Sequence, residues 1–245
     1  MERARSSFQS APPPPNVSML GPQGVALQSV FDSTTANNIE IVNRLDRLGD
    51  DVLRMALAAL NGEEDVTKVA AEASVRAGIE LVEIENVTIR SAIAALPPSH
   101  PNASLLRSRM EINNAVVVYM NASRNAGDGT YDLKADARRL AAIASEVRRN
   151  AELSRAEASQ FMVGFARAEG ITETMRSSIQ AAFATFGDSA AVVLLIADDL
   201  DAMASALSVD TPDFGAADAL IDSIVQHSET LVRQDGARAA LLANR

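Results

Sequence analysis

One stretch of the chain keeps its smallest side chain on a single stripe of a helix. The segment KADARRLAAIASEVRRNAELSRAEAS, residues 134–159, has alanine at every seventh position of its stripe. A seven-residue spacing is the period of helices that wind around one another. The four positions are Ala137, Ala144, Ala151 and Ala158. We therefore predict that this segment is one half of a long pair of packed helices.

A second segment continues the same period after Gly170. Thr172 is a suitable N-cap, and the apolar positions after it pass through Gly187 without a break. We expect one helix here, although glycine costs about 1 kcal/mol relative to alanine. Because few residues separate the two segments, they are predicted to form an antiparallel hairpin over residues 132–207. Each helix would be about 54 Å long at 1.5 Å per residue.

The two helices of this hairpin are expected to pack small side chains against large ones. Such pairing lets helix axes approach closely without leaving voids. Alanine is also the best helix former, so an alanine-rich chain could place it on any stripe. Charged residues flank this stripe as they flank a coiled-coil seam, which favours packing. The predicted helix-packing seam comprises Ala137, Ala144, Ala151, Ala158, Phe161, Phe165, Met175, Ile179, Phe186, Val193 and Leu200.

The rest of the chain is predicted to form further helices separated by proline and glycine. Residues 115–120 (AVVVYM) are rich in β-branched side chains, so a short strand stays an alternative there. We expect a first helix that ends at 61. Further helices are expected over 63–96, 102–126, 132–168, 172–207 and 211–242. The predicted fold class is all-α: an elongated antiparallel helical bundle of about six helices with a long coiled-coil-like hairpin. Residues 25–245 are expected to form one bundle domain.

Asn86 is the one polar residue on the apolar stripe of the helix predicted over 63–96. A lone buried asparagine fixes the register or the oligomeric state of packed helices, because a wrong pairing leaves its amide unsatisfied. In the alternative, the helix is rotated so that Asn86 faces water and Leu81, Ile84 and Val87 face inward. Both interpretations stay open at this point.

Residues 1–24 differ in composition from the rest of the chain. They combine serine, glutamine and glycine with four consecutive prolines, residues 12–15. Proline-rich segments favour an extended polyproline conformation over helix. We expect a flexible tail, or alternatively a peptide that docks into a groove that recognises proline-rich segments.

Composition argues against several classes of function. The chain has no cysteine, and its two histidines, His100 and His227, are far apart, so we expect neither a metal nor a cofactor. The net charge is −10 with both signs interspersed, which does not favour a nucleic-acid partner. The longest apolar run, residues 190–197, is too short to cross a bilayer, so no transmembrane segment is expected. Without an export signal, a cytoplasmic location is predicted.

No sequence motif supports catalysis. Asp213-Phe214-Gly215 has the letters of a kinase magnesium motif, but no glycine-rich loop or catalytic loop accompanies it. The acidic groups at 63–65 and 198–201 lack the histidine spacing of a di-metal bundle. We therefore predict no catalytic, cofactor-binding or metal-binding residues.

The sustained seven-residue pattern together with these exclusions predicts a non-enzymatic helical scaffold or adaptor. Its expected partners are other proteins and further copies of itself. One alternative is an amphipathic helical protein that coats a lipid or granule surface. Another is a helical-bundle enzyme or small-ligand binder with a pocket between its helices.

Overall fold

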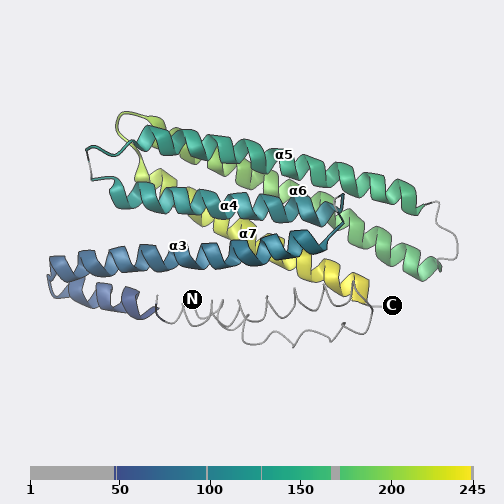
Figure 1. Cartoon of the computed structure of the whole chain (residues 1–245), viewed down its shortest axis with the longest axis horizontal. Helices are drawn as coiled ribbons and strands as arrows, with labels where there is room; N and C mark the ends of the chain where they lie inside the picture. The colour runs from purple at the N-terminus through teal and green to yellow at the C-terminus, as the bar shows by residue number, and fades with distance from the viewer. Residues whose placement is uncertain (1–46, 48, 98, 128, 167–171, 244–245) are drawn as a thin grey trace. The chain divides into compact units, whose positions relative to one another are not determined.

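The computed structural model describes residues 47, 49–97, 99–127, 129–166 and 172–243 (Figure 1). Within these residues all regular secondary structure is helical, so the predicted all-α class and helical bundle are confirmed. A first helical segment includes residues 49–60. The labelled helices are α3 (Glu64–Ala95), α4 (Pro101–Asn125), α5 (Leu133–Phe165), α6 (Glu173–Ser208) and α7 (Phe214–Ala243). The chain divides into two compact units, unit 1 (residues 1–95) and unit 2 (residues 96–245).

In unit 1, the turn before α3 forms at the predicted stop signal. Gly62 has a φ of 72°, in the left-handed region that glycine adopts without a steric penalty. The amide of Gly62 donates to the carbonyl of Ala59, and the amide of Glu63 donates to the carbonyl of Ala58 at 2.9 Å. These two bonds satisfy the last carbonyls of the helix and end it. Acidic residues at the start of α3 suit the positive end of the helix dipole.

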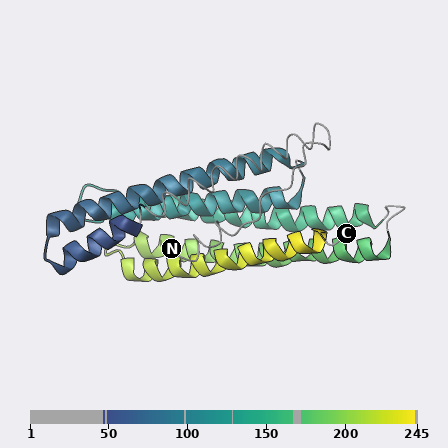
Figure 2. The ribbon, with the colours of Figure 1, turned by 90° about the horizontal axis from the view of Figure 1, so that it is seen from below.

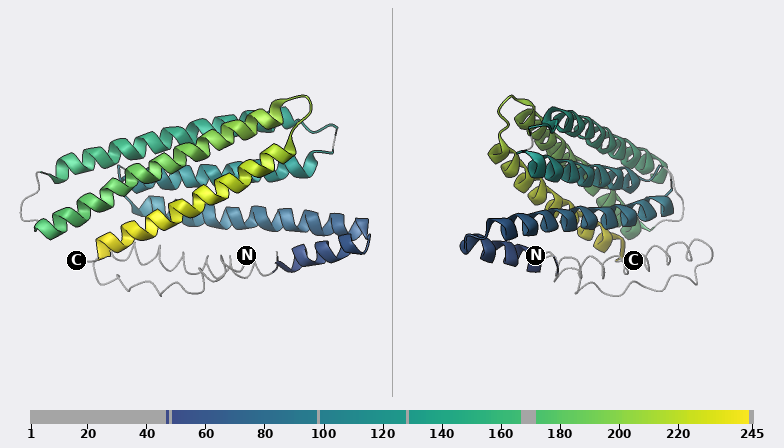
Figure 3. Two further views of the ribbon diagram at one scale, coloured as in Figure 1. Left: turned by 180° about the vertical axis from the view of Figure 1, so that it is seen from behind. Right: turned by 60° about the vertical axis from the view of Figure 1, so that its left-hand side comes forward.

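Unit 2 is a bundle of the four helices α4 to α7. Helix α5 packs against both α4 and α6, and α6 packs against α7. Consecutive helices run antiparallel, and α7 lies along α6 (Figure 2). Seen from behind, α6 lies between α5 and α7 (Figure 3, left). A hydrogen bond from the Tyr119 hydroxyl of α4 to the Asp218 carboxylate of α7 joins these two helices. Burial raises the pKa of the Tyr119 hydroxyl.

Helix α4 is continuous through residues 115–120, where a strand was the alternative. Ile112, Ala115, Tyr119 and Ala122 are spaced as one face of a helix and are at most 6% exposed. Burying this face against the neighbouring helices outweighs the weak strand preference of the β-branched residues. The segment is therefore helical.

Polar side chains cap the helices of unit 2. The Thr172 hydroxyl accepts a hydrogen bond from the Met175 amide at 3.3 Å, which confirms it as the N-cap of α6. Helix α7 begins at Phe214, slightly later than predicted, and the Asp213 carboxylate accepts from the Ala216 amide at 2.9 Å. Gly187 lies inside α6, so the predicted uninterrupted helix is confirmed.

Candidate functional site

The alanine stripe lies inside unit 2, between α5 and its neighbours. Ala144 and Ala151 have no exposed surface, and Ala137 and Ala158 are 3% and 7% exposed. The seam positions Phe186, Val193 and Leu200 on α6 are equally buried. The two helices lie antiparallel, as predicted, and the rings of Phe161 on α5 and Phe183 on α6 stack with centroids 4.0 Å apart. Small side chains of α5 thus share one core with the large ones of α6.

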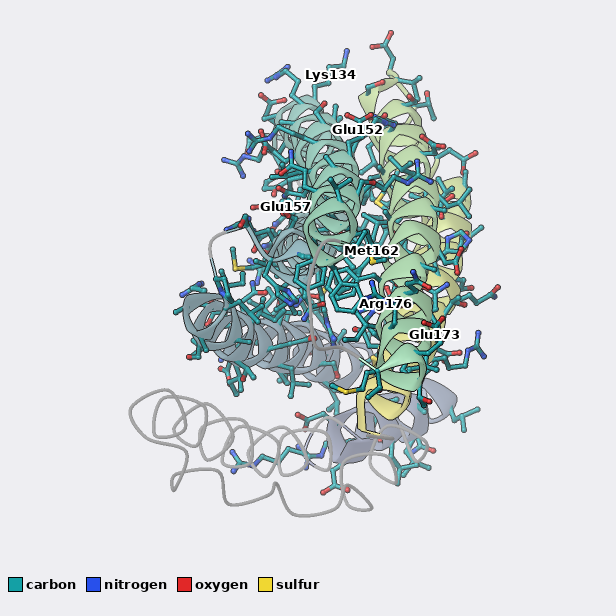
Figure 4. The ribbon with its side chains drawn as sticks, turned by 90° about the vertical axis from the view of Figure 1, so that its right-hand side faces the viewer. Lys134, Glu152, Glu157, Met162, Glu173 and Arg176 are labelled. Carbon is teal, nitrogen blue, oxygen red and sulfur yellow. The ribbon has the colours of Figure 1, made fainter. Side chains whose placement is uncertain are left out.

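The hairpin is more open at the end where α5 is followed by α6 than in its middle. The Ser154 hydroxyl donates to the carbonyl of Pro101, the first residue of α4, at 3.0 Å. The Ser104 hydroxyl of α4 reaches Glu157, one turn farther along α5, and α5 continues from there to Phe165 past the start of α4. Two predicted seam residues are partly exposed, Phe161 at 44% and Met175 at 37%, while Phe165 and Ile179 are more buried. Met162 and Arg176 lie at this end of α5 and α6, which faces the viewer in Figure 4.

Asn86 is buried in α3. Its side chain is 5% exposed, whereas Val87 is 49% exposed. The rotated helix that would place Asn86 in water and Val87 inside is therefore not the one observed. Whether Asn86 fixes a register stays a prediction.

A group of polar side chains, most of them buried or partly buried, lies near the start of α4, and we call it the polar cluster. It comprises His100, Ser104, Glu157, Thr185, Ser189, Asp235 and Arg238 and draws on all four helices of unit 2 and the residue before α4. Figure 4 shows Glu157 on α5, on the side toward α4. The Ser104 hydroxyl, which has no exposed surface, donates to the Glu157 carboxylate at 2.8 Å. This bond satisfies a carboxylate that is only 9% exposed.

Arg238 occupies the other half of the polar cluster. Its guanidinium donates to the Thr185 hydroxyl at 2.8 Å and to the Ser189 hydroxyl at 2.7 Å, and it pairs with Asp235 at 2.7 Å. The same group lies 3.9 Å from the ring centroid of Phe186, a cation–π distance. Burial lowers the pKa of Arg238, which nevertheless stays charged because arginine begins from such a high pKa. Arg238 thus links the end of α7 to α6.

His100 contacts Phe186, the same ring that Arg238 contacts. Its ring meets Phe186 edge-on, with centroids 6.2 Å apart and planes at 81°. Its Nδ1 accepts from the Asn102 amide at 3.2 Å and so caps α4. Burial lowers the pKa of His100; Glu157 raises it and Arg238 lowers it further, with a net shift downward. The neutral imidazole is therefore the form that fits, since a protonated Nδ1 could not accept this bond.

The protein is expected to lose stability as pH falls, through His100. The folded state holds its pKa below the ordinary value of 6.5, so below that pH the unfolded state binds more protons. In His100→Asn, asparagine caps the helix equally well but does not titrate. Thermal melts at pH 7.5 and 5.5 (about one unit either side of the ordinary pKa) should show a smaller acid-induced fall in Tm for the variant. Equal falls in both proteins would contradict the assignment.

Asp199, Ser223 and His227 meet between α6 and α7. The Ser223 hydroxyl donates to Oδ2 of Asp199 at 2.8 Å, and Nδ1 of His227 lies 3.2 Å from the same oxygen. These are the residue types of a hydrolase triad, but the serine proton points to the aspartate rather than to the histidine. A triad needs the serine bonded to the imidazole that removes its proton. This group therefore joins two helices and does not present an activated nucleophile.

Charged side chains also cross between α5 and α6 near the surface. Arg148 donates to Asp198 at 2.8 Å and to Asp201 at 2.9 Å, and these carboxylates raise its pKa. Lys134 of α5 pairs with Asp210 just after α6 at 2.8 Å. Such exposed pairs add little stability, but they mark which residues of the two helices lie at one level.

The described part of the chain holds no group of three or more histidine, aspartate or glutamate side chains placed to bind a metal ion. Comparisons with family models, with curated proteins and with solved structures give no match for this chain. The chemistry of the site therefore has to be judged from its own geometry. Its polar groups bond to one another, in most cases between neighbouring helices, which is an arrangement that joins helices.

Sequence reasoning did not find the polar cluster. Along the sequence, Glu157 is only one of several charged residues that flank the alanine stripe, and His100 is an isolated histidine. The contacts that form the cluster join residues far apart in sequence: Ser104 is 53 residues from Glu157, and Thr185 is 53 residues from Arg238. A usable signal is the hydroxyl residue on an otherwise apolar stripe, such as Ser154 or Ser189, because a buried hydroxyl requires a partner.

Proposed function

We propose that the protein is a non-enzymatic helical scaffold that associates with itself and with other proteins. The observation that supports this best is the use of its polar side chains. Glu157, Asp199 and Arg238, which could take part in acid, base or anion chemistry, each bond to a neighbouring helix of unit 2. The Ser104 hydroxyl, which donates to the Glu157 carboxylate, has no exposed surface and so cannot meet a substrate.

Apolar side chains on the outside of unit 2 supply surface for partners. At the end of the hairpin the exposed Phe161 stacks on Phe165 with centroids 6.2 Å apart, and Arg176 lies 5.7 Å above the Phe165 ring. Exposed apolar groups gathered in this way are typical of protein interaction surfaces. The exposed large apolar side chains of unit 2 include Leu153, Phe161, Val163, Met175, Leu195, Val225 and Val232.

Light scattering on protein separated by size tests self-association directly. A scaffold that associates with itself should elute with a mass above the 25.9 kDa of one chain, and that mass should rise with protein concentration. A single-chain mass at every concentration that can be loaded would contradict the self-association. Deletion of residues 1–24 serves as the control, because the proposed contacts lie in the helices.

A second candidate is a protein that coats an apolar surface such as a lipid. Helix α6 is long and apolar enough to cross a membrane, although 39% of its most apolar window is already buried. A core helix of a bundle passes the same test, so this observation favours the candidate only weakly. In flotation with lipid vesicles a coat protein would rise with the lipid, whereas the proposed scaffold would stay in the dense fraction.

A further inference from the structure

The outward face of the α5–α6 hairpin has mostly short side chains and one charged residue on each helix. It lies opposite the buried seam, and every position in it is exposed. Long charged side chains normally dominate the outer face of a surface helix, so many short ones are unusual. The face is formed by Ala142, Arg149, Ala156 and Val163 of α5 and by Ala184, Ala191, Asp198 and Ser205 of α6, seven residues apart within each helix. We call these eight residues the outer face.

The register of the hairpin fixes which of these residues lie at the same level. Arg148 contacts Asp198 and Asp201 within the chain, and Phe161 stacks on Phe183. Counting along two antiparallel helices from these contacts places Arg149 level with Asp198. The other pairs follow from the shared seven-residue spacing: Ala142 with Ser205, Ala156 with Ala191, and Val163 with Ala184.

The two helices of this face carry opposite net charges. Helix α5 has six basic and four acidic residues, whereas α6 has one basic and five acidic residues. A surface that presents a basic helix beside an acidic one can pair with a copy of itself, provided that α5 of one copy meets α6 of the other.

We propose that a second copy of this chain docks on the outer face, related by a two-fold axis parallel to the helices. This inference rests on the proposed self-association and names its surface. Such an axis keeps every residue at its own level while it exchanges the positions of α5 and α6. Arg149 of each copy then meets Asp198 of the other, and Ala156 meets Ala191, without any shift along the helices.

The other two-fold arrangement of the same face is less favourable. An axis perpendicular to the helices would lay α5 on α5 and α6 on α6. The acidic α6 would then face another acidic α6, and Arg149 would lie opposite Ala156. Like charges placed across an interface disfavour association, so the charge pattern selects the parallel axis.

The size of the outer face suits a modest dimer. From residue 142 to residue 163, α5 extends about 32 Å, and two adjacent helices are about 20 Å wide. Such a face buries on the order of 600 Å² from each partner, somewhat below the roughly 800 Å² of a standard interface. Short side chains at Ala156 and Ala191 let the backbones approach closely, which partly compensates for the small area.

Single-cysteine variants test the register, because the chain has no cysteine of its own. Ala156→Cys and an affinity-tagged Ala191→Cys are mixed and oxidised, and the mixed disulfide dimer is measured on non-reducing gels. It should form at least about tenfold faster than either variant's own dimer, since Cα atoms must lie within about 7 Å to be bridged. Ala142→Cys with Ala191→Cys is the matched control, with levels about 21 Å apart.

Charge reversal tests the same contact without a covalent bond. Within its own helix Arg149 also pairs with Glu146 at 2.6 Å, on an exposed surface where such a pair adds little stability. Arg149→Asp should weaken the dimer about tenfold or more, because the two contacts between Arg149 and Asp198 become repulsive. Adding Asp198→Arg should restore it, while Asp201 still pairs with Arg148 within the chain. A dimer that resists Arg149→Asp and gives no 156–191 disulfide overturns this surface but leaves self-association intact. A strictly monomeric wild-type protein overturns both, and rescue with the mixed disulfide supports both.

Discussion

Replacing Ala151 by leucine is expected to lower the free energy of unfolding by about 2–3 kcal/mol. Ala151 has no exposed surface and shares a core with Val193 and Leu200. The three added carbons have no space there, so either the helix axes separate or side chains leave their preferred rotamers. For a chain of this size the melting temperature should fall by about 4–12 °C.

Denaturation in urea, followed by far-ultraviolet circular dichroism, measures the change. Ala219→Leu is the matched control, because Ala219 is an exposed position within α7. The intrinsic helix preferences of alanine and leucine differ in the same way at both sites, and the control should change stability by no more than about 0.5 kcal/mol. If the two variants are equally stable, the alanine stripe reflects helix preference alone and the close approach of α5 and α6 is not needed.

The helices themselves were predictable because their signals are local. The seven-residue stripe, the N-cap at Thr172 and the stop at Gly62 are each written within a few residues of the feature that they determine. The same local reasoning left residues 115–120 undecided, since the β-branched preference of that segment competes with a burial pattern that only the neighbouring helices complete.

The arrangement of the helices was less predictable. The proline at 97 correctly predicted where α3 ends. Periodicity along one helix, however, does not say which other helices it packs against. The prediction treated residues 25–245 as one domain, whereas the chain divides into two compact units between Ala95 and Leu96. The exposure of Phe161 has a similar origin: it depends on where α4 begins, which the pattern along α5 does not contain.

The buried charge at Arg238 was the least predictable feature. A lone arginine near the end of a helix reads as a solvated charge in the sequence, and charged residues are rarely buried unless paired. Only the fold brings it to Phe186 and Ser189, 52 and 49 residues away. A side chain held in this way by several partners is expected to matter more for stability than its exposed neighbours.

Arg238→Ala is accordingly expected to cost about 3 kcal/mol of unfolding free energy. The change removes charge-assisted hydrogen bonds to Thr185 and Ser189, uncovers the Phe186 ring and leaves a cavity. The hydroxyl of Ser189, which has no exposed surface, would lose its guanidinium partner. Asp235 contributes little to the loss, because it is half exposed and becomes hydrated once the arginine is gone.

A second substitution separates volume from hydrogen bonding at this site. Arg238→Met fills most of the same space but donates no hydrogen bond, and it also removes the cost of burying a charge. Its expected loss is therefore smaller, about 1–2 kcal/mol. If methionine were instead as damaging as alanine, the hydrogen bonds rather than the packing on Phe186 would account for the whole effect.

The matched control for both substitutions is Arg233→Ala on the same helix. Arg233 is exposed and donates to the exposed Thr230 hydroxyl at 2.9 Å, so its removal should change stability by at most about 0.5 kcal/mol. Urea denaturation of the three variants beside the wild type gives the comparison. Equal effects of Arg238→Ala and Arg233→Ala would show that the polar cluster does not hold the end of α7 against α6. The link between these helices would then rest on the apolar core and on the contacts of Asp199.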